Sequence, residues 1–268
     1  MRLAVQEHLL PGDTMQAKWE TALAWGFDAI ELRGGGGHAL RRRLPELRSA
    51  RRDGVEMPTV CVDMDHFIGD FDAARRADAL ANMASQLAVI GELGGVGAMT
   101  PAAWGLFSRR LPPFAPPRSA EGDRAVLLDA LGRLGEIARR EGVLLLLEPL
   151  NRYEDHMVNT LAQATELTTA TGLDSVRVVA DTYHMNIEEA DPLAALRDNA
   201  VRLAHVQLSD SNRLEPGAGH LDWGALLSCL EAIGYDGHLA FECRLSGPAA
   251  RVLPRAAAML RSSLRVAA

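Results

Sequence analysis

The sequence predicts an α/β fold, a single (β/α)8 TIM barrel that spans residues 1–268. Strand-like aliphatic runs alternate eight times with longer helix-like segments, and no change in composition divides the chain. Residues 143–147 are five aliphatic residues in a row, which indicates a strand buried on both faces, as in a parallel sheet covered by helices. A length of 268 residues is typical of one such barrel. An open doubly wound sheet is the alternative that this pattern leaves.

The expected strands are short apolar segments bounded by glycine, proline or polar residues. In chain order they cover residues 2–7, 29–33, 57–62, 95–100, 143–148, 176–181, 202–208 and 238–243. Amphipathic or alanine-rich segments between them predict helices, several with a glycine just after the last turn. These helices cover residues 13–25, 40–53, 72–93, 121–141, 160–171, 188–199, 222–233 and 249–266. With right-handed crossovers, this alternation makes the strands parallel.

Composition and charge exclude several classes of function. Hydrophobic residues form 48% of the chain, enough for a large core, and the net charge of −7 argues against nucleic acid as a partner. The N-terminal residues lack the apolar segment of a signal peptide, and no apolar run reaches the length of a membrane span. The cysteines have no paired spacing and are expected to be reduced core residues. They are Cys61, Cys229 and Cys243. We therefore expect a cytoplasmic protein with no membrane partner.

Four polar residues share one place in the predicted barrel, the carboxyl end of a strand. They are Glu148, Asp181, Gln207 and Glu242, on the fifth to eighth strands. Active sites of such barrels lie at the carboxyl ends of the strands. Three carboxylates gathered there would repel one another, and a divalent cation would offset that repulsion. Ligands that offer only oxygen favour Mg2+ or Mn2+ over zinc.

Five segments of the chain carry a resemblance to a known family. They read LEPLNRYE, ADTYHMN, HVQLSDSNR, PGAGHLDW and GYDGHLAFEC, all within residues 143–243. In this order and at these separations they resemble the xylose-isomerase-like barrel family of sugar phosphate isomerases and epimerases. Within that family the motifs are most similar to those of the ketose 3-epimerases, which act on D-tagatose or D-psicose, and of the hydroxypyruvate isomerases.

The resemblance implies a role for each matching residue. It implies that Glu148 and Glu242 are the catalytic residues and also ligands of the metal ion, with Asp181 and Gln207 as the other ligands. The family's epimerases usually have His where this chain has Gln207, whereas the hydroxypyruvate isomerases are similar in having Gln. The residues that the resemblance assigns to substrate binding are Glu154, His184 and Arg213.

The resemblance also implies a reaction, a cofactor and partners. The expected reaction is C3 epimerisation of a ketose through a cis-enediolate, with the two glutamates as acid and base. The implied cofactor is one divalent metal ion, Mn2+ first, with Mg2+ or Co2+ as alternatives. The implied partners are a small sugar or keto-acid substrate and further copies of the chain, in a dimer or a tetramer.

Several alternative activities use related machinery. An aldose–ketose or hydroxypyruvate-type isomerase would move a proton between neighbouring carbons with the same residues. A lyase or dehydratase acting on a keto-sugar or keto-inositol, including the relatives that cleave C-glycosides, would share the first proton removal. An endonuclease acting at abasic sites needs a trinuclear zinc centre rich in histidine, whereas the fourth strand ends in Met99, Thr100 and Pro101. A binding protein without activity is disfavoured because both catalytic glutamates are present.

The loops of the first half of the chain give open interpretations. Residues 101–117 contain five prolines and predict a loop over the mouth of the barrel. Its Trp104 and Phe107 either line the pocket or pack the loop against the barrel. Four further polar residues follow the first and third strands, where each either contacts the substrate or lies beside the pocket. They are His8, Asp63, Asp65 and His66.

Overall fold

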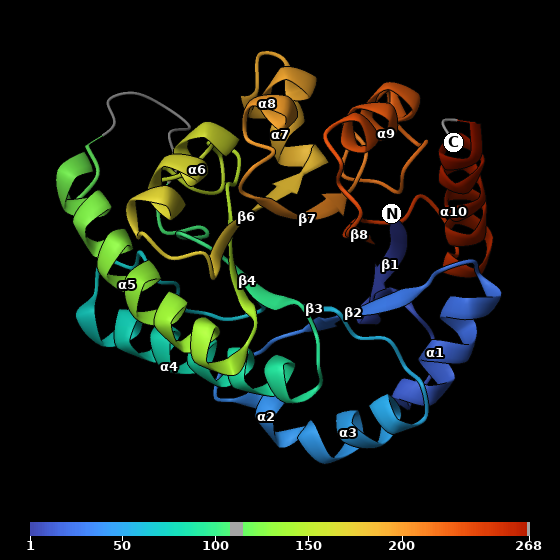
Figure 1. The fold of residues 1–268 in the computed structure, drawn as a ribbon, viewed down its shortest axis with the longest axis horizontal. Coiled ribbons are helices and arrows are strands. Elements are labelled where there is room, and N and C mark those ends of the chain that lie inside the picture. Colours follow the sequence, from blue (N-terminus) through green and yellow to red (C-terminus); the bar gives the residue numbers. More distant parts are fainter. Residues whose placement is uncertain (108–114, 267–268) are drawn as a thin grey trace.

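The computed structural model describes residues 1–107 and 115–266 and shows a closed barrel of eight parallel strands surrounded by helices (Figure 1). Each strand pairs with the next one in the chain, and β1 pairs with β8 to close the barrel. This confirms the predicted (β/α)8 barrel. It excludes the open doubly wound sheet, because an open sheet has two strands without a second neighbour.

The strands are β1 (Arg2–Gln6), β2 (Ala29–Arg33), β3 (Thr59–Cys61), β4 (Gly97–Pro101), β5 (Leu144–Glu148), β6 (Val176–Asp181), β7 (Leu203–Leu208) and β8 (His238–Phe241). The helices are α1 (Met15–Ala24), α2 (Ala39–Arg42), α3 (Leu44–Arg52), α4 (Ala73–Glu92), α5 (Ala120–Glu141), α6 (Leu161–Ala170), α7 (Thr182–Glu188), α8 (Pro192–Asp198), α9 (Trp223–Ala232) and α10 (Ala249–Val266), with a short 3-10 helix η1 (Glu7–Leu9). All eight predicted strands are present, and the bounds of β2, β6 and α10 are those expected.

β5 shows why an uninterrupted aliphatic run forms a central strand. Leu145 and Leu147 point outward into the main core between the barrel and its helices. Leu146 points into the barrel, where it packs against Met99 and Val179 of neighbouring strands. Because side chains alternate between two buried faces, every position of this strand favours an apolar residue.

The barrel interior changes from small to polar side chains along its axis. Ala4, Ala29 and Ala240 form one layer of buried side chains. The next residues on the same face of these strands, two positions after each alanine, are Gln6, Glu31 and Glu242. The polar residues therefore gather toward the carboxyl ends of the strands, where the sequence predicted the site.

The segment predicted as one helix over residues 40–53 is two helices, α2 and α3, which meet at Arg43. Pro45 lies in the first turn of α3. Proline has no backbone N–H to continue the hydrogen bonding of a preceding helix, and it fits well in the first turn of a new one. The prediction of a single helix is therefore wrong at this point.

The segment from Asp181 to Asp191 also differs from the prediction. α7 covers residues 182–188, of which 182–187 were expected to be a loop; it forms because Oδ1 of Asp181 accepts hydrogen bonds from backbone N–H groups of its first turn. The helix expected from residue 188 begins only at Pro192, as α8, with Asp191 as its N-cap. His184 consequently lies on a helix whose orientation the cap fixes.

The cysteines Cys61, Cys229 and Cys243 are free and buried, as predicted. No helix within the described residues is both long and apolar enough to cross a bilayer. The predicted loop 101–117 includes residues 108–114, which lie outside the described residues, and its first residue still belongs to β4.

Candidate functional site

A pocket of about 620 Å3 opens at the carboxyl ends of the strands. This volume is in the range of small-molecule sites. Five of the residues predicted from the sequence line it, namely Glu148, Glu154, His184, Arg213 and Glu242. Asp181 and Gln207 are 1% and 0% exposed; Asp181 contacts Arg213 of the pocket, and Gln207 donates a hydrogen bond to the buried Glu31. The structure therefore brings the predicted site residues into one region.

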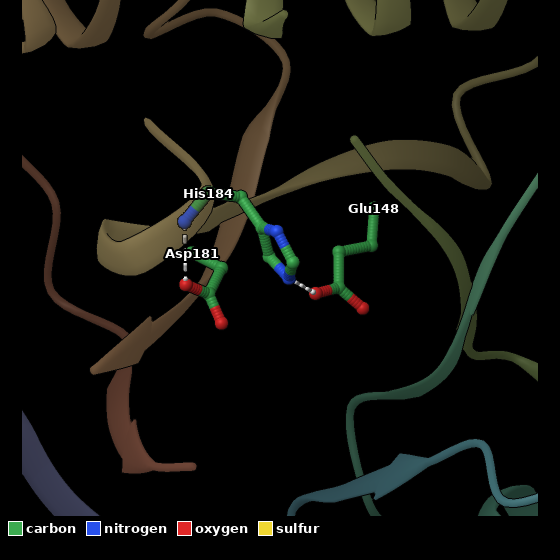
Figure 2. A group of neighbouring side chains, drawn as sticks. All are labelled: Glu148, Asp181 and His184. Carbon is green, nitrogen blue, oxygen red and sulfur yellow. Dashed lines mark hydrogen bonds and ion pairs between the residues drawn. The ribbon is translucent and has the colours of Figure 1, made fainter. Parts of the chain in front are cut away.

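Glu148 is the last residue of β5 and is 4% exposed. Burial raises the pKa of its carboxyl group well above the ordinary value, and the nearby Glu242 and Asp181 carboxylates raise it further. Oε1 of Glu148 lies 3.8 Å from Nε2 of His184, and the two side chains point toward each other (Figure 2). Glu148 is thus a buried acid that faces a histidine.

Asp181 ends β6 and caps α7 at the same time. Its Oδ1 accepts hydrogen bonds from the backbone N–H groups of Tyr183, at 2.7 Å, and His184, at 3.2 Å. The helix N-terminus stabilises the negative charge of the capping carboxylate. With Oδ1 occupied in this way, Oδ2 is directed toward Arg213 in the site.

His184 is held through its inner ring nitrogen. Nδ1 accepts a hydrogen bond from the backbone N–H of Asn151 at 2.9 Å. Burial lowers the pKa of His184, and a neutral imidazole that accepts at Nδ1 carries its proton on Nε2. In this tautomer Nε2 is a donor that faces Glu148 and the pocket, and Nη1 of Arg213, which also lies 3.2 Å from Nε2, donates to Asp181 instead.

Ligand atoms of Glu148, Asp181 and His184 lie within 4.8 Å of one another, a spacing that can hold a metal ion (Figure 2). A protonated Nε2 has no lone pair for a metal ion, however. The hydrogen bond from Asn151 thus favours His184 as a donor to substrate, the role that the sequence resemblance implies, over a role as a ligand.

Arg213 supplies the positive charge of the site. Its Nη1 lies 3.2 Å from Oδ2 of Asp181, its Nη2 lies 3.5 Å from Oε1 of Glu242, and the guanidinium covers the ring of Tyr183 at 4.7 Å. Burial opposes the charged form, but the surrounding carboxylates outweigh burial and raise the pKa of Arg213. The backbone φ of Arg213 is +63°, a strained value for a residue with a side chain, and these contacts offset the strain.

Glu242 follows the last residue of β8, and its backbone N–H donates to the carbonyl of Leu208 at 3.1 Å. The side chain is 21% exposed, on the wall of the pocket. Burial raises the pKa of the carboxyl group to about 8, against the opposite effect of Arg213 and with a further increase from Asp181. A carboxyl group with this pKa exchanges a proton readily near neutral pH.

Gln207 lies on β7 in the barrel interior. Its Nε2 donates a hydrogen bond to Oε1 of Glu31 at 3.0 Å. His205, two residues earlier on the same face of the strand, contacts the same Glu31. Burial opposes the charged form of Glu31, but His205 and the hydrogen bonds to the carboxylate lower its pKa below the ordinary value.

Two side-chain oxygen atoms of the predicted metal ligands are buried without a hydrogen-bond partner among the described residues. They are Oε1 of Gln207 and Oε2 of Glu242. An unpartnered buried oxygen costs about 1–3 kcal/mol, and coordination to a hard cation such as Mn2+ or Mg2+ removes that cost. Gln207 and Glu242 are two of the four residues expected from the sequence to bind the metal ion, with Glu148 and Asp181 as the others.

The structure shows which residues of the loops at the mouth line the pocket. Trp104 lines the pocket and donates from Nε1 to Oε2 of Glu154 at 3.1 Å, whereas Phe107 packs edge-on against the ring of His156 at 5.2 Å. His8 and Asp63 line the pocket, and Asp63 pairs with Arg33 at 2.8 Å. Asp65 and His66 are not among the described residues that line the pocket, and His66 pairs with Asp78 of α4 at 2.8 Å.

Three residues of the site were missed by reasoning from the sequence. Asn151 and Tyr183 lie within the quoted motifs, but their role is to support His184 and Arg213. Glu31 offered a stronger signal, because an acid in the middle of the apolar strand AIELR must be paired or hydrogen-bonded when the strand is buried on both faces.

The comparison with known families agrees with this geometry. A family described as the xylose isomerase-like TIM barrel matches residues 19–263. The chain belongs to this family. Within the xylose isomerase-like TIM barrel family, the chain is similar to several sugar epimerases.

The chain is 39% identical to the 3-dehydro-D-guloside 4-epimerase of Escherichia coli (strain K12) over 246 residues, which cover 91% of this chain and 93% of that protein. It is similar to the crystal structure of a 3-keto-D-glucoside 4-epimerase from E. coli, with a TM-score of 0.91 and 38% identity over 98% of this chain and 99% of that one. The L-ribulose 3-epimerase of Mesorhizobium japonicum is 41% identical over 113 residues, 42% of this chain and 38% of that protein.

Proposed function

We propose that this protein is a metal-dependent sugar epimerase that inverts a hydroxyl-bearing carbon next to a ketone. The observation that carries this proposal is the pair of Glu148 and Glu242, two carboxylic acids of raised pKa that line one pocket. Carboxyl groups with raised pKa can accept and return a proton at neutral pH. Two such groups on opposite faces of the substrate can invert a carbon, one by removing a proton and the other by returning one.

A glycoside with a ketone in its sugar ring is the substrate class that we favour, with inversion at C4 next to a C3 ketone. The similarity to the 3-dehydro-D-guloside 4-epimerase of E. coli extends over nearly the whole of both chains. A pocket of about 620 Å3 also leaves room for a group attached to the sugar.

C3 epimerisation of a free ketose, the reaction expected from the sequence, is the second candidate. Here too the inverted carbon lies next to a ketone, so the same acid and base serve both reactions. The 41% identity to the L-ribulose 3-epimerase of M. japonicum favours this candidate, although that match covers less than half of the chain.

A metal ion at this site is supported by the unpartnered oxygens of Gln207 and Glu242. We propose Glu148, Asp181, Gln207 and Glu242 as its ligands, with Mn2+ as the first choice and Mg2+ or Co2+ as alternatives. When bound, a divalent ion acts as a Lewis acid that stabilises negative charge on the ketone oxygen and the neighbouring hydroxyl oxygen.

The two glutamates carry the proton transfers. The ionised one removes the proton from the carbon next to the ketone, which leaves a cis-enediolate, and becomes protonated. The other, protonated at the start, gives its proton to the opposite face of the same carbon and becomes ionised. The carbon is inverted and no proton is consumed, and exchange with solvent at the partly exposed Glu242 restores the starting state.

The remaining residues position the substrate. His184 donates from Nε2 to a substrate oxygen, since Asn151 holds its Nδ1 as an acceptor. Arg213 stabilises negative charge at the same oxygens from the other side of the site. Glu154, held by Trp104 at the mouth, accepts a hydrogen bond from a sugar hydroxyl.

Proton exchange in D2O tests this function. The Mn2+-loaded protein is incubated with 3-keto-glucosides and 3-keto-gulosides, free ketoses, hydroxypyruvate and keto-inositols, and deuterium is located by NMR. We expect deuterium at C4 of a 3-keto-glycoside together with its C4 epimer. Deuterium at C3 of a free ketose, with the C3 epimer, would select the second candidate.

Other products of the same experiment would replace the proposal. An aldose or tartronate semialdehyde would identify an isomerase, and release of a leaving group would identify a lyase. Absence of exchange with every compound, while Mn2+ is shown to be bound, would contradict the epimerase function.

A further inference from the structure

Glu31 lies beneath the candidate metal site, in the middle of β2, with no exposed surface. It is not part of the proposed ligand set. A buried carboxylate is costly unless hydrogen bonds compensate for the loss of water. The residues that provide these hydrogen bonds indicate what Glu31 does.

Both carboxylate oxygens of Glu31 are occupied by side chains from other strands. Oε1 accepts from Nε2 of Gln6 at 3.1 Å and from Nε2 of Gln207 at 3.0 Å. Oε2 accepts from the hydroxyl of Thr59 at 2.7 Å and contacts Nε2 of His205 at 2.7 Å. The carboxylate thus ties β1, β3 and β7 together across the barrel interior.

These contacts determine which end of the Gln207 amide faces the metal site. A carboxylate only accepts hydrogen bonds, so Gln207 must turn its NH2 group toward Glu31. Its Oε1 then points the other way, and this is the atom that has no partner among the described residues. The last torsion of a glutamine is soft and nearly two-fold, so the amide alone would not choose between these orientations.

We propose that Glu31 is a positioning residue for the metal site, because its carboxylate holds the Gln207 amide with the oxygen toward the ion. This inference rests on the proposed metal-dependent function. Partners that orient metal ligands in this way typically contribute about 10- to 100-fold to metal affinity.

Substitutions that swap the side chains of Glu31 and Gln207 test this role. Mn2+ affinity is measured by calorimetry on chelator-treated protein for the wild type, Gln207→Glu and the double variant Glu31→Gln/Gln207→Glu. The single variant adds a charged oxygen ligand, which by itself favours Mn2+. It also removes the donor to Glu31, so we expect Mn2+ affinity to fall by about 10-fold or more.

The double variant restores the hydrogen bond in the opposite direction, with the amide on β2 as donor. We expect its Mn2+ affinity to return close to that of the wild type. Tight binding by Gln207→Glu alone, or no recovery in a folded double variant, would overturn the proposal. The control Thr59→Val removes a hydrogen bond to Oε2 of Glu31 without contact with Gln207, and should leave Mn2+ affinity nearly unchanged.

A crystal structure of the Mn2+-loaded wild-type protein tests the proposal without any substitution. The Gln207 amide should lie between the ion and Glu31, and an amide away from either partner would refute the role of Glu31. A wild-type protein that binds no Mn2+ would contradict the metal centre and this inference together. A protein that binds Mn2+ but exchanges no substrate proton would contradict only the proposed activity.

Discussion

Nη1 of Arg213 lies 3.2 Å from Oδ2 of Asp181, and Nη2 of the same guanidinium lies 3.5 Å from Oε1 of Glu242. One residue of the loop after β7 therefore offsets the charge of carboxylates at the ends of β6 and β8. Arg213 also lines the pocket, where we expect it to contact the oxygens of a bound substrate. The role of Arg213 can be tested separately from that of the glutamates.

Arg213→Asn should lower kcat/KM by about 10- to 100-fold, since a hydrogen bond to a charged group contributes about 1.5–3 kcal/mol. The protein should stay folded, because asparagine tolerates the left-handed backbone at this position. Steady-state kinetics and circular dichroism check both expectations. Arg213→Lys, which keeps the charge but loses the fork geometry, should retain part of the activity. Wild-type kcat/KM in Arg213→Asn would show that Arg213 does not act on the substrate.

Glu148→Gln and Glu242→Gln should each lower kcat for epimerisation by at least about 100-fold, the usual contribution of a general acid or base. In the metal-free protein neither variant should lose thermal stability, because each removes a buried acid whose pKa the fold has raised. The matched control Glu188→Gln lies outside the pocket, where Glu188 pairs with Arg152, and should turn over normally.

The two glutamate variants should also differ in proton exchange. For a given epimer, the variant that keeps the base should still exchange the substrate proton in D2O without inverting the carbon. The variant that lacks the base should do neither. Near-normal epimerisation in either variant would refute the mechanism with two glutamates.

Removal of metal should abolish activity and lower stability, and Mn2+ should restore both. A ligand that binds only the folded state stabilises it by about 2.7 kcal/mol at a concentration of 100 Kd. Calorimetric melting of chelator-treated protein with increasing Mn2+ measures this effect. Asp181→Asn should show a smaller increase in melting temperature, and an unchanged increase would exclude Asp181 as a ligand.

The lowered pKa of His238, a residue outside the pocket lining, predicts that the stability of the fold depends on pH. Burial, with a further contribution from Arg2 and His205, lowers the pKa of His238 from 6.5 to about 4. The folded state thus disfavours the charged form of His238. The contribution of the neutral His238 to the free energy of unfolding is present above pH 6.5 and is lost as the pH falls through 4. It amounts to about 3 kcal/mol at most.

Urea unfolding of the wild type and His238→Gln at pH 7 and pH 4 checks this expectation. The free energy of unfolding of the wild type should fall more steeply with acid than that of the variant. Equal slopes would show that His238 titrates in the folded protein as it does in the unfolded chain.

The fold was predictable because its signals are local. The bounds of β2, β6 and α10 followed from short apolar runs and an amphipathic segment. The errors were local as well. Pro45 divides one expected helix into two, and the capping group of Asp181 creates α7 where a metal ligand before a loop had been expected. A carboxylate at the end of a strand that also caps the next helix is difficult to recognise from a sequence pattern.

Periodicity and motif spacing are properties of neighbouring residues, so they are enough to predict the fold class and the polar residues at the strand ends, Glu148, Asp181, Gln207 and Glu242. The orientation of these side chains depends instead on contacts that form only in the folded barrel. Glu31 reaches Gln207 across 176 positions of the chain, and Asn151 fixes the ring of His184 across 33. Closure of the barrel brings these partners together, and the direction of each hydrogen bond depends on that meeting rather than on either segment alone.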